Sequence, residues 1–91
     1  MDANYSREFD KACNDCIAQG AKNIIVDMSE LAYVCSMGLR YFVNVGKTLN
    51  EAGGALRLSG IHGLVKQLFQ LTRLNDVFPT HDSVDAALAA I

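Results

Sequence analysis

The apolar run at residues 24–26 (Ile-Ile-Val) constrains the fold of this chain more than any other stretch of the sequence. It is long enough for a buried strand and too short for a buried helix, and a polar turn follows it at residues 27–30. A second apolar segment, residues 31–34, ends at the sequence Cys-Ser-Met-Gly, and a helical pattern begins directly after it. We therefore predict a strand over residues 23–28 whose carboxyl end leads to a helix that starts near Ser36.

The rest of the chain alternates between helical and strand patterns. Apolar residues at helical spacing predict four helices, and short apolar runs predict two further strands. The predicted helices lie near residues 5–17, 37–52, 62–71 and 83–90, and the predicted strands lie at 23–28, 55–59 and 76–80. This alternation predicts the α/β class, with right-handed crossovers and a small, mostly parallel sheet. Pro79 lacks an N–H group, so we expect the strand at 76–80 to lie at an edge.

Each predicted helix carries one apolar stripe that we expect to face the core. Asn4 or Ser6 is expected to cap the first helix, and Gly20 to end it. The residues expected to be buried are Tyr5, Phe9, Ala12, Cys13, Cys16 and Ile17 in the first helix, Leu39, Phe42, Val43, Gly46, Leu49 and Ala52 in the second, Leu64, Val65, Leu68 and Phe69 in the third, and Val84, Ala87, Leu88 and Ile91 in the last.

Length and composition limit the functional classes. A chain of 91 residues with 51% hydrophobic and 20% charged residues is typical of one globular domain, predicted over residues 1–91. The net charge of −2 argues against a nucleic-acid partner. No apolar stretch is long enough to span a membrane, and the polar, acidic N-terminus does not resemble a signal peptide. Three cysteines without such a signal predict reduced thiols in a cytoplasmic protein.

Two short motifs suggest chemistry that their positions do not support. Cys13 and Cys16 have the spacing of a redox or zinc motif, but they lie in mid-helix on an apolar stripe, without a second pair of ligands. We interpret both as small core residues. The triplet Gly46-Lys47-Thr48 resembles the end of a phosphate-binding loop, but the motif requires a glycine where Tyr41 stands. The sequence therefore predicts no metal, no cofactor and no catalytic group.

The two histidines and Cys35 are expected to have no catalytic role. His62 and His81 lie near helix starts and far apart in the sequence, and we expect both to face solvent. Cys35 adjoins a helix N-terminus, where a thiol can become more acidic, although an inert, partly buried thiol is the commoner case.

Ser36 has two interpretations. It is either an ordinary helix N-cap or a regulatory site at a position that attracts anions. Arg40 lies one helical turn further on, within reach of a phosphate on Ser36. Met37 and Gly38 are apolar and small, which suits a protein-docking surface better than a solvated cap.

Taken in order, the segments IIVDMSELAYV, CSMGL, EAGGALRLSGI, LVKQLFQLTRL and NDVFPTHDSVDAAL resemble a STAS domain, the family of bacterial anti-sigma-factor antagonists. The resemblance covers about residues 2–88, and its strength lies in the order and spacing of the segments. It implies a STAS-like fold and a signalling module without enzymatic activity.

The resemblance also implies a site. Ser36 occupies the position of the serine that a partner kinase phosphorylates. The unphosphorylated domain binds an anti-sigma factor, often itself a serine kinase of the histidine-kinase-like ATPase type, and phosphorylation separates the pair. The implied partner-binding residues are Cys35, Ser36, Met37, Gly38, Arg40, Tyr41, Ile61 and His62.

The chain departs from the family pattern in two places. Cys35 stands where the family has an aspartate before the serine, which weakens the expectation of kinase recognition. The one or two N-terminal strands of the family have no counterpart, so the chain is expected to be N-terminally truncated. The edge that this leaves is expected to be covered by a partner chain, by self-association or by helix repacking.

Two alternative functions remain. A STAS-like scaffold subunit that is never phosphorylated, in a larger regulatory or transport assembly, is compatible with the change at Cys35. A thiol enzyme that uses Cys35, or Cys13 with Cys16, is the alternative from a different class.

Overall fold

The computed structural model describes residues 1–91 and contains five helices and three strands. In chain order these are α1 (Ala3–Ala18), β1 (Asn23–Asp27), α2 (Ser36–Glu51), β2 (Ala55–Ser59), α3 (Gly63–Leu71), α4 (Leu74–Val77), β3 (Thr80–His81) and α5 (Val84–Ala89). The predicted α/β class is confirmed. None of the helices is both long and apolar enough to cross a membrane.

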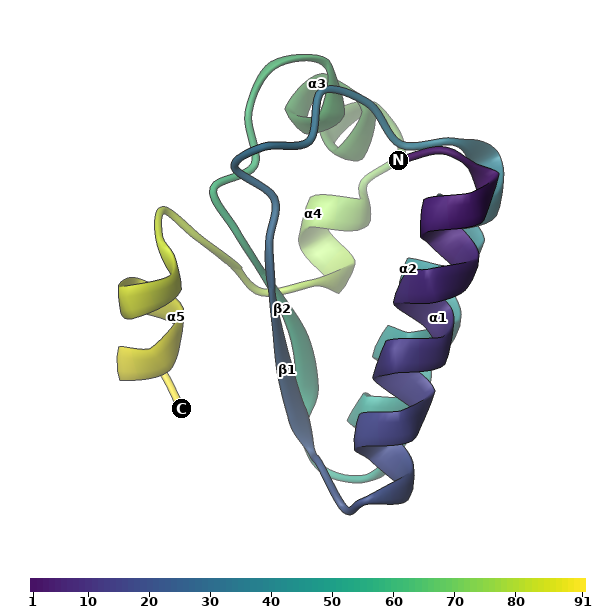
Figure 1. Ribbon diagram of the computed structural model, residues 1–91. Coiled ribbons are helices and arrows are strands. Elements are labelled where there is room, and N and C mark those ends of the chain that lie inside the picture. The colour runs from purple at the N-terminus through teal and green to yellow at the C-terminus, as the bar shows by residue number, and fades with distance from the viewer.

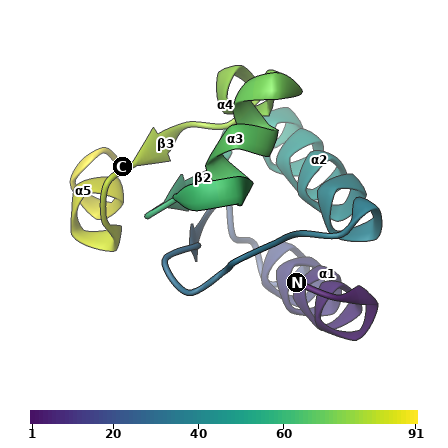
Figure 2. The same cartoon turned by 90° about the horizontal axis from the view of Figure 1, so that it is seen from above.

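The three strands form one parallel sheet in the order β1-β2-β3. Asn23 pairs with Ala55 and Asp27 with Ser59, so β1 and β2 are in register over their whole length. Helices α1 and α2 lie on one side of the sheet and α5 lies on the other (Figure 1). Viewed from above, α3 and α4 extend the first layer past β2 (Figure 2). The carboxyl ends of β1 and β2 therefore meet at one end of the molecule.

The predicted strand at 76–80 is wrong in its first half. Residues 74–77 form α4, and strand pairing begins only at Thr80, which lies opposite Leu58. The N–H of Phe78 donates to the carbonyl of Leu74 at 3.0 Å, as in a helix. Leu74 and Phe78 both face the core while Val77 is 62% exposed, which is a helical spacing and not an alternation. The expected edge position is confirmed, because β3 pairs only with β2.

A row of four aromatic rings connects the helices across the core. The ring centroids of Phe9 and Phe42 are 4.7 Å apart, those of Phe42 and Phe69 6.1 Å, and those of Phe69 and Phe78 6.4 Å. These distances are typical of favourable aromatic contacts. The row joins α1, α2, α3 and the segment before β3, so it holds the first helical layer together.

The predicted apolar stripes are only partly buried. Tyr5 of α1 is 53% exposed, Leu64 of α3 is 71% exposed and Leu88 of α5 is 58% exposed. On α1 the residues that face inward are Ser6, Phe9, Cys13 and Ile17, a stripe rotated from the predicted one. Helix α1 packs mainly against α2, and helix α3 mainly against α4, so each buries a thinner stripe than its apolar residues alone suggest.

Candidate functional site

The start of α2 lies at the end of the molecule where β1 and β2 finish, which is where ligands commonly bind in parallel α/β sheets. Ser36 is the first residue of α2, and its side chain is exposed and makes no hydrogen bond within the chain. Cys35 occupies the N-cap position in an extended conformation, also without a side-chain capping bond. The interpretation of Ser36 as the N-cap is therefore wrong, and its hydroxyl remains free.

Contacts from the N-terminal segment hold this helix start in place. The N–H of Cys35 donates to the carbonyl of Met1 at 3.0 Å. The hydroxyl of Ser6, which is fully buried, donates to the carbonyl of Asp2 at 2.7 Å and lies 3.4 Å from Cys35 Sγ. These contacts of Met1 and of Ser6 in α1 with Cys35 fix the backbone position at the start of α2, next to Ser36.

Gly38 permits the close approach of α1 and α2. It is buried, and a Cβ atom at this position would lie 2.9 Å from both Ser6 Oγ and Val34 Cγ1. Gly38 was predicted to contact a partner. It is buried instead, and because it has no side chain the first turn of α2 packs closely against α1.

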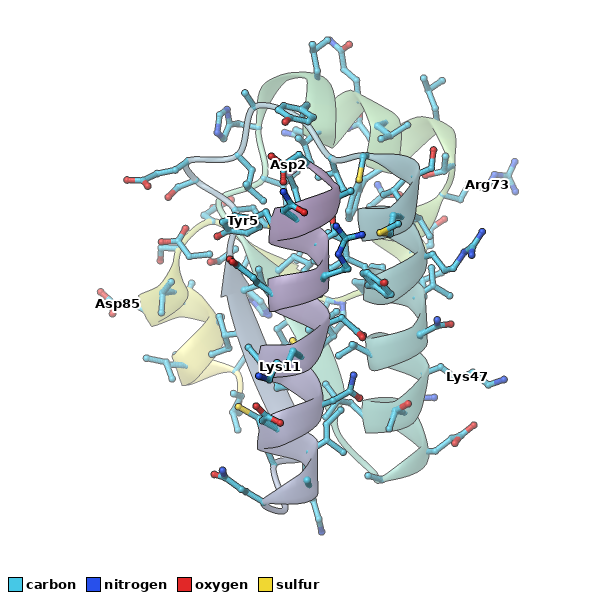
Figure 3. The ribbon with its side chains drawn as sticks, turned by 45° about the vertical axis from the view of Figure 1, so that its right-hand side comes forward. Asp2, Tyr5, Lys11, Lys47, Arg73 and Asp85 are labelled. Carbon is cyan, nitrogen blue, oxygen red and sulfur yellow. The ribbon has the colours of Figure 1, made fainter.

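Sequence reasoning missed the role of Ser6, which was considered only as a helix cap. The cap of α1 is Asp2, whose carboxylate accepts the N–H of Tyr5 at 2.8 Å, and Figure 3 shows both residues at the first turn of α1. A signal was present in the sequence, since positions 6, 9, 13 and 17 follow helical spacing. A small polar residue in an apolar stripe is a sign of a buried hydrogen bond.

The electrostatics of the helix start favour an anion. The first N–H groups of α2 point out of the helix end, where the helix dipole is positive, and the first turn contains no acidic residue. The Ser6 hydroxyl, and after it the N–H groups at the start of α2, lower the pKa of the Cys35 thiol. Arg40 is exposed one turn after Ser36 and forms no ion pair.

The loops that follow β1 and β2 are joined to one another. The Nε2 of His62 lies 2.6 Å from the carbonyl oxygen of Ser29, so this nitrogen carries the proton and donates. The side chain of Asp27 accepts the N–H of Ser29 at 3.0 Å, and hydrogen bonds from Ser29 lower the pKa of that carboxyl. Gly60 adopts φ +67° beside Ser29, a conformation that favours glycine.

The predicted partner-binding residues therefore lie on two segments at one end of the molecule. Ser36, Arg40 and His62 are exposed, whereas Gly38 is buried. The partly buried members are Cys35, Met37, Tyr41 and Ile61. We call the seven of these residues that are exposed or partly buried the α2–β2 surface. His62 was expected to face solvent and does, and its ring also bridges to the β1 loop.

The two remaining cysteines differ from one another. Cys13 is buried, and burial, with smaller contributions from Cys16 and Asp10, raises its pKa to about 11. Cys16 is exposed, so the prediction that both are core residues is right for Cys13 and wrong for Cys16.

The sequence model of the STAS domain family matches residues 1–87 of this chain. The chain is 31% identical over 74 residues to a Bordetella bronchiseptica protein named "Putative anti-sigma factor antagonist BtrV", which corresponds to 81% of this chain and 64% of that protein. It is 26% identical over 85 residues to the anti-sigma-B factor antagonist of Staphylococcus aureus, covering 93% of this chain and 79% of the relative. The chain thus spans less than two thirds of the length of the Bordetella protein.

Solved structures show the same fold. A crystal structure from Thermotoga maritima superposes with a TM-score of 0.90 at 22% identity, covering 98% of this chain and 77% of that one. The crystal structure of an anti-sigma factor antagonist from Mycobacterium paratuberculosis gives a TM-score of 0.85 at 21% identity, covering 100% and 77% of the two chains. With the family match over almost the whole sequence, these findings show that the chain belongs to the STAS domain family.

Proposed function

We propose that this chain is an anti-sigma-factor antagonist that binds an anti-sigma factor through the α2–β2 surface, and that it acts by binding and not by catalysis. The observation that supports the proposal best is the state of Ser36, an exposed serine with a free hydroxyl on a helix start that α1 holds in place. The names of the relatives point to the same class of partner.

We further propose that a serine kinase, which can be the anti-sigma factor itself, phosphorylates Ser36 and thereby ends binding. A phosphate adds about −1.5 to −2 charges at neutral pH. At the N-terminus of α2 this charge is favourable for the domain itself, and Arg40 lies within reach on the same helix face. In the middle of a closed interface the same charge must be desolvated, and every 1.4 kcal/mol of lost binding free energy lowers affinity about tenfold.

The direct test of the switch is a binding measurement with Ser36→Asp. Calorimetry against an anti-sigma factor that binds the unmodified chain should show affinity reduced at least about 100-fold, because a buried uncompensated charge costs about 3 kcal/mol or more. Thr48→Asp is the matched control, since it adds the same charge to an exposed site at the far end of α2 and should leave affinity unchanged. Equal binding by both variants would contradict a role for Ser36 in the interface.

Phosphorylation itself is tested by incubating the chain with a kinase of the histidine-kinase-like ATPase type and ATP, followed by intact-mass measurement. One phosphate is expected, and Ser36→Ala should abolish it. If a kinase that is active on another substrate adds no phosphate, the scaffold function becomes the better description.

The observation that favours the scaffold function is Cys35. A thiol stands where the resemblance implies an aspartate, and its sulfur lies 3.4 Å from Ser6 Oγ. A scaffold subunit would use the α2–β2 surface for permanent contact with a larger assembly. Binding that is unaffected by kinase and ATP distinguishes this function from the switch.

We also propose that copies of this chain associate at the free edge of β1. The sheet ends at β1, whose residues Ile24, Ile25 and Val26 are only partly buried. Unpaired strand edges with apolar residues readily pair with another chain.

A further inference from the structure

Arg57, in the middle of β2, is a partly buried cation without a counterion. Its neighbours Leu56 and Leu58 face the core, so Arg57 points to the opposite face of the sheet, which α5 covers. Its Nε atom is buried and has no hydrogen-bond partner. Buried polar groups without partners are rare in native proteins, and a buried charge is normally paired.

The single polar contact of Arg57 is to His81 of β3. The two side chains approach to 3.3 Å between Nη1 and Nε2. Arginine can only donate hydrogen bonds, so His81 must accept at Nε2 and carry its proton at Nδ1. A neutral ring cannot balance the charge of the guanidinium.

No carboxylate on this face compensates Arg57. The carboxylate of Asp27, at the end of β1, is engaged by the N–H of Ser29. Asp85 of α5 points away from the sheet (Figure 3). The remaining acid nearby, Asp82, is exposed and forms no hydrogen bond or ion pair with Arg57.

His81 also lines a cavity of about 130 Å³ between α3, α4 and β3, which we call the β3 pocket. Its polar lining consists of Lys66 and Gln70 of α3, Asn75 of α4, and Thr80, His81 and Asp82. Phe69 and Ile61 supply the apolar part. The pocket thus places one ammonium group, two amides, a hydroxyl, an imidazole and one carboxylate around a space that holds a small ion and a few waters.

We propose that the β3 pocket binds a small oxyanion, a phosphate or a carboxylate. Lys66 would hold the anion directly, with the amides of Gln70 and Asn75 and the hydroxyl of Thr80 as further donors. Arg57 contacts His81 but does not line the pocket, so its charge adds only a long-range attraction to the anion. The volume suits a single phosphate or carboxylate group and is too small to enclose a nucleotide.

Asp82 opposes such a ligand, because its carboxylate lines the same cavity. The proposal therefore predicts opposite effects on anion binding for the charges of Asp82 and Lys66. Removing the charge of Asp82 should tighten binding, whereas removing the charge of Lys66 should weaken it.

The experiment is an NMR titration of the ¹⁵N-labelled chain with inorganic phosphate, and separately with acetate, at constant ionic strength against sodium chloride. Saturable shifts are expected at the amides of residues 66–70 and 80–82. Lys66→Gln should raise the dissociation constant about tenfold, as expected for the loss of one charged hydrogen bond. Asp82→Asn should lower the dissociation constant several-fold. Lys11→Gln is the matched control, because Lys11 is an exposed lysine on α1, away from the pocket (Figure 3).

The two ligands distinguish the source of the oxyanion, since saturation by phosphate alone indicates a phosphate site and saturation by acetate alone a carboxylate site. Linear shifts that do not saturate, or equal effects of Lys66→Gln and Lys11→Gln, would overturn the proposal. The result does not depend on the proposed switch, because Ser36→Ala leaves every lining residue of the pocket in place.

Discussion

At the scale of single residues, the chemistry of the Cys35 thiol depends on Ser6. The Ser6 hydroxyl lies 3.4 Å from Cys35 Sγ. When the thiol ionises, the hydroxyl can turn its single proton from the carbonyl of Asp2 to the thiolate, and this is the main cause of the lowered pKa of Cys35. The thiolate is the nucleophile, so a lower pKa means faster alkylation at neutral pH. Cys13 lies at the other extreme, with a pKa of about 11.

We therefore predict a fixed order of alkylation by iodoacetamide at pH 7. Cys35 should react first, the exposed Cys16 second and the buried Cys13 last, measured by mass spectrometry of peptides over time. Ser6→Ala should slow Cys35, whereas Ser83→Ala, which removes a hydroxyl that caps α5, should not. Faster alkylation of Cys16 than of Cys35 would contradict this account. A rate far above that of free cysteine would favour the thiol-enzyme alternative.

At the scale of elements, the packing of α2 against the segment before β3 depends on Gly46. A Cβ atom at this position would lie 2.5 Å from a ring carbon of Phe78, which is itself buried against Phe69. An exposed Gly→Ala change inside a helix would gain about 1 kcal/mol from helix propensity. Here overpacking opposes that gain, since an added methyl group in a close-packed core typically costs about 1–3 kcal/mol.

We predict that Gly46→Ala lowers the free energy of unfolding, measured by urea denaturation. The matched experiment is a double-mutant cycle with Phe78→Leu, whose smaller side chain leaves room for the new methyl group. In the Phe78→Leu background the cost of Gly46→Ala should fall by about 1 kcal/mol. Additive effects would show that the two residues do not press against each other.

At the scale of the whole molecule, the free edge of β1 is the feature that a solution measurement can test. The carbonyl of Lys22 and the N–H of Met28 both pair with β2, so even-numbered residues of this strand point their backbone groups inward. The backbone groups of Asn23, Ile25 and Asp27 then point to the unpaired edge, because these directions alternate along a strand.

We predict that the chain self-associates with rising concentration in sedimentation velocity, and that Asn23→Pro reduces the association. Proline removes an N–H from the free edge without breaking a bond to β2. Ile24→Pro is the matched control, because it removes an N–H that pairs with β2 and should unfold the domain instead. A chain that stays monomeric at every concentration would contradict self-association at this edge.

Much of the architecture follows from the sequence. The strands predicted at 23–28 and 55–59 are observed at 23–27 and 55–59. They could be predicted because each apolar run is short and lies between turn residues, so the run fits a strand and is too short for a helix. Residues 74–78 could not be assigned in the same way. Their few apolar residues fit the spacing of a helix or of a strand. In the structure both Leu74, which is partly buried, and Phe78, which is buried, face the core, and this spacing of four residues favours a helical turn.

The sequence by itself determined the α/β class, the order of the elements up to α3 and the place of Ser36 at a helix start, because these depend on local periodicity and on turn chemistry. Only the tertiary structure decided which face of α1 is buried, that Cys35 and not Ser36 occupies the N-cap, and that Ser6 lies against Cys35. It also decided that Arg57 and His81 meet beside the β3 pocket. These contacts join residues 24 or more positions apart in the chain, and no local pattern contains the packing that brings them together.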